Sequence, residues 1–102
     1  MNKIVVNRCF GEFNLSEEAI RWLLEKGNKD TKIAVARYEE VAFSRDRHNQ
    51  DLVKCVETLG KAASGDDAKL EIKHIEGNQY RIIEYDGYES VETPESIKWT
   101  TI

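Results

Sequence analysis

The side chains with the most chemistry to offer are two cysteines and two histidines: Cys9, Cys55, His48 and His74. A structural zinc site needs its ligands in short paired spacings, and these four residues show none, so neither a metal nor another cofactor is expected. A cysteine nucleophile beside a histidine base is formally available, because Cys9 lies between a strand and a helix start, where a thiolate is favoured. Packed, unreactive thiols are the simpler interpretation. The sequence therefore predicts no enzyme, with Cys9-dependent catalysis as the weakest alternative.

The loop Cys9-Phe10-Gly11-Glu12-Phe13 runs from the first predicted strand into the first predicted helix, which is the outline of an anion-binding turn. It lacks the glycine spacings of the nucleotide-binding fingerprints, and Glu12, Glu17 and Glu18 would repel a phosphate there. A small-ligand site remains as an alternative. Its candidate residues are Arg8, Phe10, Gly11 and Phe13, beside Arg45 and Arg47.

Two polar segments are candidates for contact with a protein partner. The loop Arg45-Asp46-Arg47-His48 carries guanidinium groups that can bind carboxylates through two parallel hydrogen bonds. The segment Tyr85-Asp86-Gly87-Tyr88-Glu89 places two aromatic residues among carboxylates, which suits a surface that faces a basic protein. A solvated loop and tyrosines packed on a sheet are the respective alternatives. The predicted partner-binding residues are Arg45, Asp46, Arg47, His48, Tyr85, Asp86, Tyr88 and Glu89.

The elements that must position these residues begin with a strand and a helix. Residues 3–8 contain a β-branched run that is apolar at consecutive positions, which predicts a central strand buried on both faces. An amphipathic helix follows, with Asn14 and Ser16 as competing N-caps and with Lys26 and Gly27 at its end.

The middle of the chain predicts a second strand and a second helix. Residues 28–30 predict a turn, residues 32–43 alternate loosely as a strand does, and residues 44–50 are a polar loop. The second helix begins at Asn49 or Asp51 and ends around Ala63, with Gly65 as its C-terminal cap. Gly60 inside this helix marks either close packing or an earlier end.

The last third predicts β-structure. Residues 70–75 and 80–83 form a hairpin across Gly77-Asn78, and Asp86-Gly87 turns into a short strand over residues 88–92. After Pro94, residues 97–102 predict a last edge strand or an ordered tail that Trp99 docks. The order β-α-β-α-β-β-β predicts one α+β domain over residues 1–102, a mostly antiparallel sheet of four to five strands with two helices on one face.

Composition limits the setting and the partners. The chain has 102 residues, a net charge of −4, and nine acidic against four basic residues in positions 65–102. Proteins that grip nucleic-acid phosphates show the reverse balance, so no direct nucleic-acid contact is expected. Without a secretory signal or a membrane-spanning apolar run, we expect a cytoplasmic protein with reduced thiols. A core this small makes a homo-oligomer a natural way to bury more surface.

The chain resembles a recurrent group of small bacteriophage and prophage proteins over about three quarters of its length. The resemblance rests on an N-terminal block, Ile4 to Gly11 with Phe13, Leu15 and Ser16, and on a C-terminal block, Glu84-Tyr85-Asp86-Gly87-Tyr88-Glu89. Glu12 stands where the group usually has a second glycine. The resemblance implies an accessory protein that is encoded by a phage and acts in the cytoplasm of the infected bacterium.

Together these observations predict a non-catalytic binding protein. Small size, the phage-like blocks and the acidic last third favour a protein that inhibits a host bacterial defence component, for example a CRISPR effector, in the manner of an anti-CRISPR protein. The alternative is an oligomeric small-ligand binder that sequesters a nucleotide signal.

Overall fold

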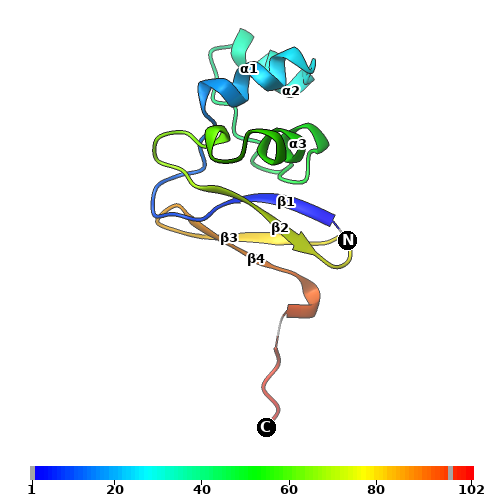
Figure 1. Ribbon diagram of the computed structural model, residues 1–102. Helices are drawn as coiled ribbons and strands as arrows, with labels where there is room; N and C mark the ends of the chain where they lie inside the picture. Colours follow the sequence, from blue (N-terminus) through cyan, green and yellow to red (C-terminus); the bar gives the residue numbers. More distant parts are fainter. Residues whose placement is uncertain (1, 97) are drawn as a thin grey trace.

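The computed structural model describes residues 2–96 and 98–102, and its elements stack in three layers (Figure 1). Three helices form the first layer, an antiparallel pair of strands the second, and an antiparallel hairpin the third. The elements are β1 (Asn2–Asn7), α1 (Glu17–Glu25), α2 (Lys29–Ala36), α3 (Gln50–Leu59), β2 (Leu70–Ile75), β3 (Arg81–Tyr85) and β4 (Tyr88–Glu92), with short 3-10 turns at Gly60–Ala63 and Pro94–Ser96. The α+β class is confirmed, with the order β-α-α-α-β-β-β.

Strand β1 is buried on both faces because it lies in the middle layer. Val5 faces the helices and joins the main core with Leu23 and Leu52, and all three side chains are fully buried. Ile4 and Val6 point the other way and pack with Ile75 against the inner face of the hairpin, where they meet Tyr80, Ile82 and Val91. The prediction of a strand apolar on both faces is confirmed, but within residues 2–96 and 98–102 β1 pairs with β2 alone, so it is not the central strand of a wide sheet.

Helix α1 begins and ends as the sequence predicts. Ser16, rather than Asn14, is its N-cap, because the Ser16 side chain accepts a hydrogen bond from the amide of Ala19 at 3.1 Å. The carboxylates of Glu17 and Glu18 lie in the first turn, where the helix dipole favours negative charge. Gly27, with φ of +77°, follows the last turn in the left-handed conformation that glycine adopts without strain.

The predicted strand over residues 32–43 is wrong. Helix α2 occupies Lys29–Ala36, and no strand lies between residues 37 and 49. Asn28 is the N-cap that favours a helix here. Its Oδ1 accepts hydrogen bonds from the amide and the hydroxyl of Thr31 at 2.9 and 2.7 Å. Its Nδ2 donates to Asp51 at 2.9 Å and ties α2 to the start of α3. This tertiary contact overrides the β-branched alternation of Ile33 and Val35.

Helix α3 ends earlier than Ala63. Asn49 caps its start by accepting from the amides of Asp51 and Leu52, and the helix stops at Leu59. Gly60, with φ of +58°, is the C-cap, so the early end is the correct interpretation and Gly65 lies beyond a separate 3-10 turn.

The strands pair differently from the prediction. The proposed hairpin of residues 70–75 with 80–83 is wrong, because β2 pairs with β1 over its whole length and the chain then crosses into the next layer. The β3–β4 hairpin around Asp86-Gly87 is confirmed. Instead of the expected single sheet of four to five strands with two helices, the described part of the chain has two sheets of two strands and three helices.

The C-terminal segment leaves the domain instead of docking on it (Figure 1). Residues 98–102 carry no strand, and Trp99 is 86% exposed. Ile97, part of the predicted last strand, lies outside the described residues.

The capping role of Asn28 gives a first prediction. Replacing Asn28 with Ala removes the N-cap of α2, the acceptor of the buried Thr31 hydroxyl and the bond to Asp51, so we expect a loss of about 2 kcal/mol in the free energy of unfolding. Urea denaturation followed by circular dichroism measures it. Asn78→Ala, an exposed asparagine between β2 and β3, is the control and should stay within about 0.5 kcal/mol of the wild type. Equal stabilities of the two variants would contradict the assignment.

Candidate functional site

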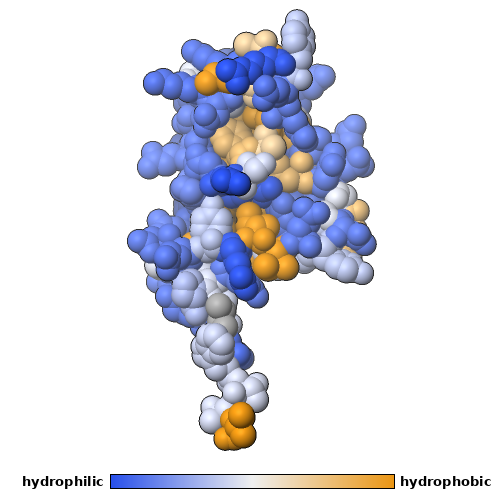
Figure 2. Space-filling view, turned by 180° about the vertical axis from the view of Figure 1, so that it is seen from behind, coloured by the Kyte–Doolittle hydropathy of each residue, from blue (hydrophilic) through white to orange (hydrophobic). Residues whose placement is uncertain are grey.

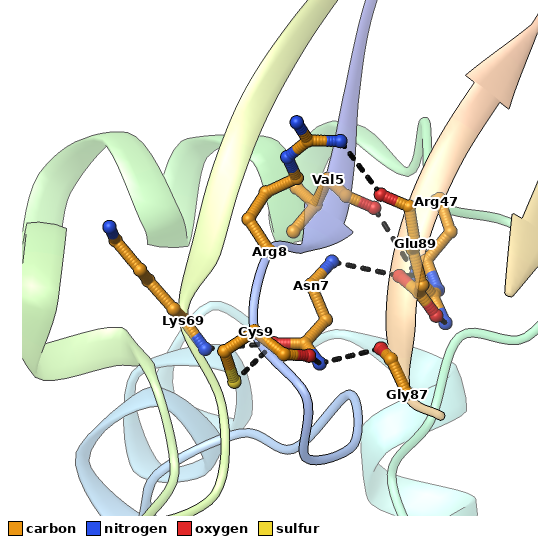
Figure 3. A network of polar contacts seen from close by, with 8 residues as sticks. All are labelled: Val5, Asn7, Arg8, Cys9, Arg47, Lys69, Gly87 and Glu89. Carbon is orange, nitrogen blue, oxygen red and sulfur yellow. Dashed lines mark hydrogen bonds and ion pairs between the residues drawn. The ribbon is translucent and has the colours of Figure 1, made fainter. Parts of the chain in front are cut away.

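A buried ion pair joins the loop before α3 to strand β4 (Figure 3). The guanidinium of Arg47 meets the carboxylate of Glu89 through two parallel contacts, Nη1 to Oε1 at 2.5 Å and Nη2 to Oε2 at 2.9 Å. Arg47 is 7% exposed and Glu89 is 4% exposed. The Arg47 guanidinium also stacks on the ring of Phe13, 3.7 Å from its centroid. Such fork-to-fork pairing fixes the geometry of both side chains.

The same pair covers the edge of β1 that faces away from β2. The amide of Val5 donates to the carbonyl of Arg47 at 2.9 Å, and the amide of Asn7 donates to Glu89 Oε1 at 2.8 Å. Arg47 Nη1 in turn donates to the carbonyl of Val5 at 3.3 Å. Buried backbone groups need partners, and a strand edge left open invites pairing with other chains. Arg47 and Glu89 therefore take the place of a third strand.

Asn7 extends this network to the glycine loop. Its Nδ2 donates to the carbonyl of Gly87 at 2.8 Å, and its Oδ1 accepts from the amide of Lys69 at 2.8 Å (Figure 3). The Cys9 thiol donates to the carbonyl of Asp67 at 3.2 Å and also contacts Asn7 Oδ1. The buried side of the predicted Cys9 loop is thus occupied by hydrogen bonds within the domain.

Close backbone contacts hold the Gly11 loop from two sides. A β-carbon at Gly11 would overlap the carbonyl of Asp67, and one at Gly87 would overlap the carbonyl of Gly11. The amide of Glu12 donates to Asp67 at 3.1 Å. The loop is packed against protein on both sides, which leaves no open cradle for a phosphate.

An exposed aromatic cluster lies on the outer side of this network. The rings of Phe10 and Tyr88 have centroids 5.2 Å apart, and the Arg8 guanidinium lies 4.5 Å from the Tyr88 centroid. Tyr85 is the cross-strand partner of Tyr88, so both side chains occupy the same face of the hairpin, as does Ile83 two residues earlier. We call Phe10, Ile83, Tyr85 and Tyr88 the aromatic patch. Phe10 and Tyr85 are each 73% exposed.

Other large apolar side chains are exposed elsewhere in the chain. Figure 2 shows the face opposite to the view of Figure 1, where apolar side chains gather at the centre inside a hydrophilic border. The exposed large hydrophobic residues outside the patch are Ile33, Val35, Tyr38, Trp99 and Ile102.

The loop of residues 45–48 borders two hollows at the opposite end of the hairpin. The larger, of about 860 Å³, lies between α3 and residues 75–80, and the smaller, of about 560 Å³, lies between residues 44–48 and the start of β3. His48 lines both hollows: its Nδ1 lies 2.8 Å from the Tyr80 hydroxyl and its Nε2 lies 3.1 Å from Asp46. Burial raises the pKa of the Tyr80 hydroxyl above its ordinary value.

The structure separates the predicted site residues into two groups. Arg47, Glu89 and Phe13 are buried and bind one another, so they serve the fold. Arg45, His48, Tyr85 and Asp86 are exposed, with Asp46 and Tyr88 half-buried beside them. Within the alternative ligand set, Phe13 lies inside the domain while Phe10 points outward, so the two rings do not face a common ligand.

Cys9 and His48 do not form the dyad weighed from the sequence: the hydrogen bonds of Cys9 go to Asn7 and Asp67, and those of His48 go to Asp46 and Tyr80. Burial raises the pKa of the Cys55 thiol to about 11, which keeps it protonated.

Sequence reasoning missed Asn7, Tyr80 and Ile83. Asn7 carried a signal, because a polar residue directly after a buried apolar run needs hydrogen-bond partners. For Tyr80 and Ile83 the sequence held no signal of a functional role, only the alternation that predicts a strand.

Across residues 2–96 and 98–102, no three or more His, Cys, Asp or Glu side chains gather as ligands for a metal ion. Nor does any helix within those ranges have the length and apolar character that crossing a bilayer requires. Comparisons with protein-family models, with curated proteins and with solved structures found no match.

The ion pair gives a second prediction. Replacing Arg47 with Ala leaves the Glu89 carboxylate buried without its partner, and removing one member of a buried pair costs about 3–5 kcal/mol. Urea denaturation measures the loss. The matched control is Arg45→Ala, two residues away and exposed, which should change stability by less than about 0.5 kcal/mol. A stable Arg47→Ala protein would show that the pair does not hold the layers together.

The glycine contact gives a third prediction. Gly87→Ala combines a positive φ of +86° with an overlap against the Gly11 backbone, so we expect a loss above about 3 kcal/mol or failure to fold. Gly77→Ala tests the backbone strain alone, because φ is +74° there and the nearest atom is a flexible Glu95 oxygen 3.8 Å away. We expect a loss of about 1–2 kcal/mol for Gly77→Ala. Similar losses in a thermal melt would argue against the close approach.

Proposed function

We propose that the protein is a non-catalytic binding protein that docks on a host bacterial protein through the aromatic patch. The proposal rests mainly on the exposure of Phe10 and Tyr85, each 73%. Both residues lie next to the buried hydrogen bonds that Asn7 makes with Gly87 and Glu89. Aromatic side chains together with Arg are the residues that most often dominate the free energy of protein–protein binding. The patch offers three aromatic rings and Arg8 in one place.

Rigidity supports this role. Phe10 follows Cys9 and precedes Gly11, and both neighbours are fixed by contacts with Asp67. Arg8 is held from a second side, because its Nη1 donates to the carbonyl of Glu89 at 2.9 Å. A surface that is ordered before binding loses little conformational entropy when the partner arrives. The patch is therefore suited to docking without rearrangement.

The charge around the patch indicates the chemistry of the partner. Exposed carboxylates of Glu12, Asp67 and Asp86 border the Phe10 loop and the hairpin turn. The last third of the chain adds a clear acidic excess. Complementarity then favours a partner whose apolar contact site has a basic rim. Proteins that bind nucleic acids carry such basic surfaces.

The resemblance to phage proteins supplies the setting. We propose that the target is a nucleic-acid-binding component of a bacterial defence system, such as a CRISPR effector, and that binding takes place in the cytoplasm of the infected cell. An acidic protein that covers a basic surface blocks access of nucleic acid to it. Sequestration of a nucleotide signal has less support, because Arg47 and Phe13 stack on each other inside the domain.

The fourth prediction concerns the patch. The tagged wild type, Phe10→Ala and Tyr85→Ala are used as bait in host lysate, and each protein that the wild type retains is identified, purified and titrated by calorimetry. We expect a basic protein that heparin displaces and whose Kd rises about 30-fold with either variant, the effect of losing about 2 kcal/mol. Both variants change exposed side chains and should keep the thermal stability of the wild type.

Tyr38→Ala is the matched control, because Tyr38 is 99% exposed and lies after α2 in the helical layer. It should leave the Kd unchanged. Binding that is equally strong with Phe10→Ala and Tyr85→Ala, or a partner that heparin does not displace, would contradict the proposed docking surface.

A further inference from the structure

Strand β3 has a free edge in the described part of the chain, because its one strand neighbour is β4. The hairpin turns through Asp86 and Gly87, whose φ values of +49° and +86° fit the two-residue turn that joins antiparallel strands. In such a hairpin the residues that flank the turn form a hydrogen-bonded pair, and these pairs alternate along the strands. Tyr85, Ile83 and Arg81 therefore direct their backbone groups toward β4, whereas Ile82 and Glu84 direct theirs to the free edge.

We propose that this edge pairs with the β3 strand of a second copy of the chain, antiparallel and with the two-fold axis at Ile83. Ile82 of one copy and Glu84 of the other then exchange both backbone hydrogen bonds, and symmetry repeats the exchange on the other side of the axis. The two Ile83 side chains, each 44% exposed, meet at the axis. The result is a four-stranded sheet in the order β4–β3–β3–β4.

The side chains of β3 are complementary to themselves in this register. Arg81 of one copy faces Tyr85 of the other on the outer side of the sheet, at the cross-strand spacing that permits a cation–π contact. The Nε and Nη2 of Arg81 contact Glu92 on β4, and the Arg81 side chain stays 66% exposed, so its guanidinium is accessible on the outer face of the hairpin. A shift of the register by one residue would lose this pairing and separate the two Ile83 side chains.

Charge complementarity continues beyond the strand. One position further along, the Asp86-Gly87 turn of the second copy arrives beside Tyr80, at the hollow of about 560 Å³ that Arg45 and Arg81 line. The carboxylate of Asp86 would then face the guanidinium of Arg45. The two segments that the sequence marks for partner binding, around Arg45 and around Tyr85, become the two halves of one interface.

This pairing does not rest on the proposed function, although it uses Ile83 and Tyr85, which also belong to the aromatic patch. Phe10 and Tyr88 lie outside β3 and stay on the outer face of the sheet, so a dimer presents two copies of this aromatic pair on one side. Pairing through a five-residue strand belongs to the smaller class of interfaces, for which we expect a Kd on the order of micromolar.

The fifth prediction tests the edge by sedimentation velocity of the full chain between about 1 and 500 μM, the range that brackets a weak interface. The wild type should pass from monomer to dimer. Arg81→Glu combined with Glu92→Arg keeps the pair within the hairpin but places a carboxylate among the acidic residues of the second copy, so we expect at least a tenfold weaker association. A wild type that stays monomeric throughout, or a double variant that dimerises equally well, overturns the proposal.

A cysteine placed at the axis tests the register. In a Cys9→Ser background, Ile83→Cys should form an intermolecular disulfide on mild oxidation. The two copies of residue 83 would be directly opposed in a non-hydrogen-bonded pair, whose Cα atoms lie about 4.5 Å apart, and a disulfide can span that distance. Ser90→Cys is the matched control, exposed on the same face but on β4, opposite Ile83 within the hairpin. Equal rates of cross-linking at the two positions contradict the register. A failure of this pairing is distinguishable from a failure of the patch, because Phe10→Ala in the patch experiment changes a residue that lies outside β3.

Discussion

The Arg47–Glu89 ion pair is the contact on which the three layers depend, because it connects the loop before α3, the free edge of β1 and the hairpin strand β4. Two strands alone make a marginal sheet, and β1 would otherwise have buried amides without acceptors along one edge. In most sheets a third strand would supply the acceptors. Here the backbone carbonyl of Arg47 accepts from Val5 and the carboxylate of Glu89 accepts from Asn7. This arrangement buries the charges of Arg47 and Glu89, which must therefore stay paired. The position of Glu89 in turn fixes Tyr88 and Arg8, and through them the exposed aromatic patch.

Local signals in the sequence were sufficient for α1, α3 and the β3–β4 hairpin. Ser16, Asn49 and the Asp86-Gly87 turn each act on their immediate neighbours, so a short stretch of chain determines the outcome. Strand pairing could not be inferred in the same way. Gly77-Asn78 looks like a hairpin turn, but Ile4 and Val6 need a cover on one face and Val5 needs one on the other. That requirement places β2 beside β1 and sends β3 into a separate layer.

The candidate site illustrates the same division. The sequence marked the segments around Arg45 and Tyr85 as polar and aromatic, and both do carry exposed side chains. It gave no sign that Arg47 and Glu89, one in each segment and 42 residues apart in the chain, bind each other. The pairing ties the two segments together, and their residues divide into those that hold the fold and those that are exposed and free to contact a partner. Exposure of Phe10, three residues after the end of β1, likewise depends on the Gly11 loop packing against Asp67 and Gly87.

The most direct test of the account is amide hydrogen exchange at Val5 and Asn7, measured by nuclear magnetic resonance under native conditions. These two amides face away from β2 and are protected through Arg47 and Glu89. If the ion pair replaces a third strand, their protection should match that of the Arg8 amide, which donates to the carbonyl of Lys69 next to β2. Exchange at Val5 and Asn7 that is a hundredfold or more faster than at Arg8, roughly 2.7 kcal/mol less protection, would contradict the account, because the edge of β1 would then be open to water.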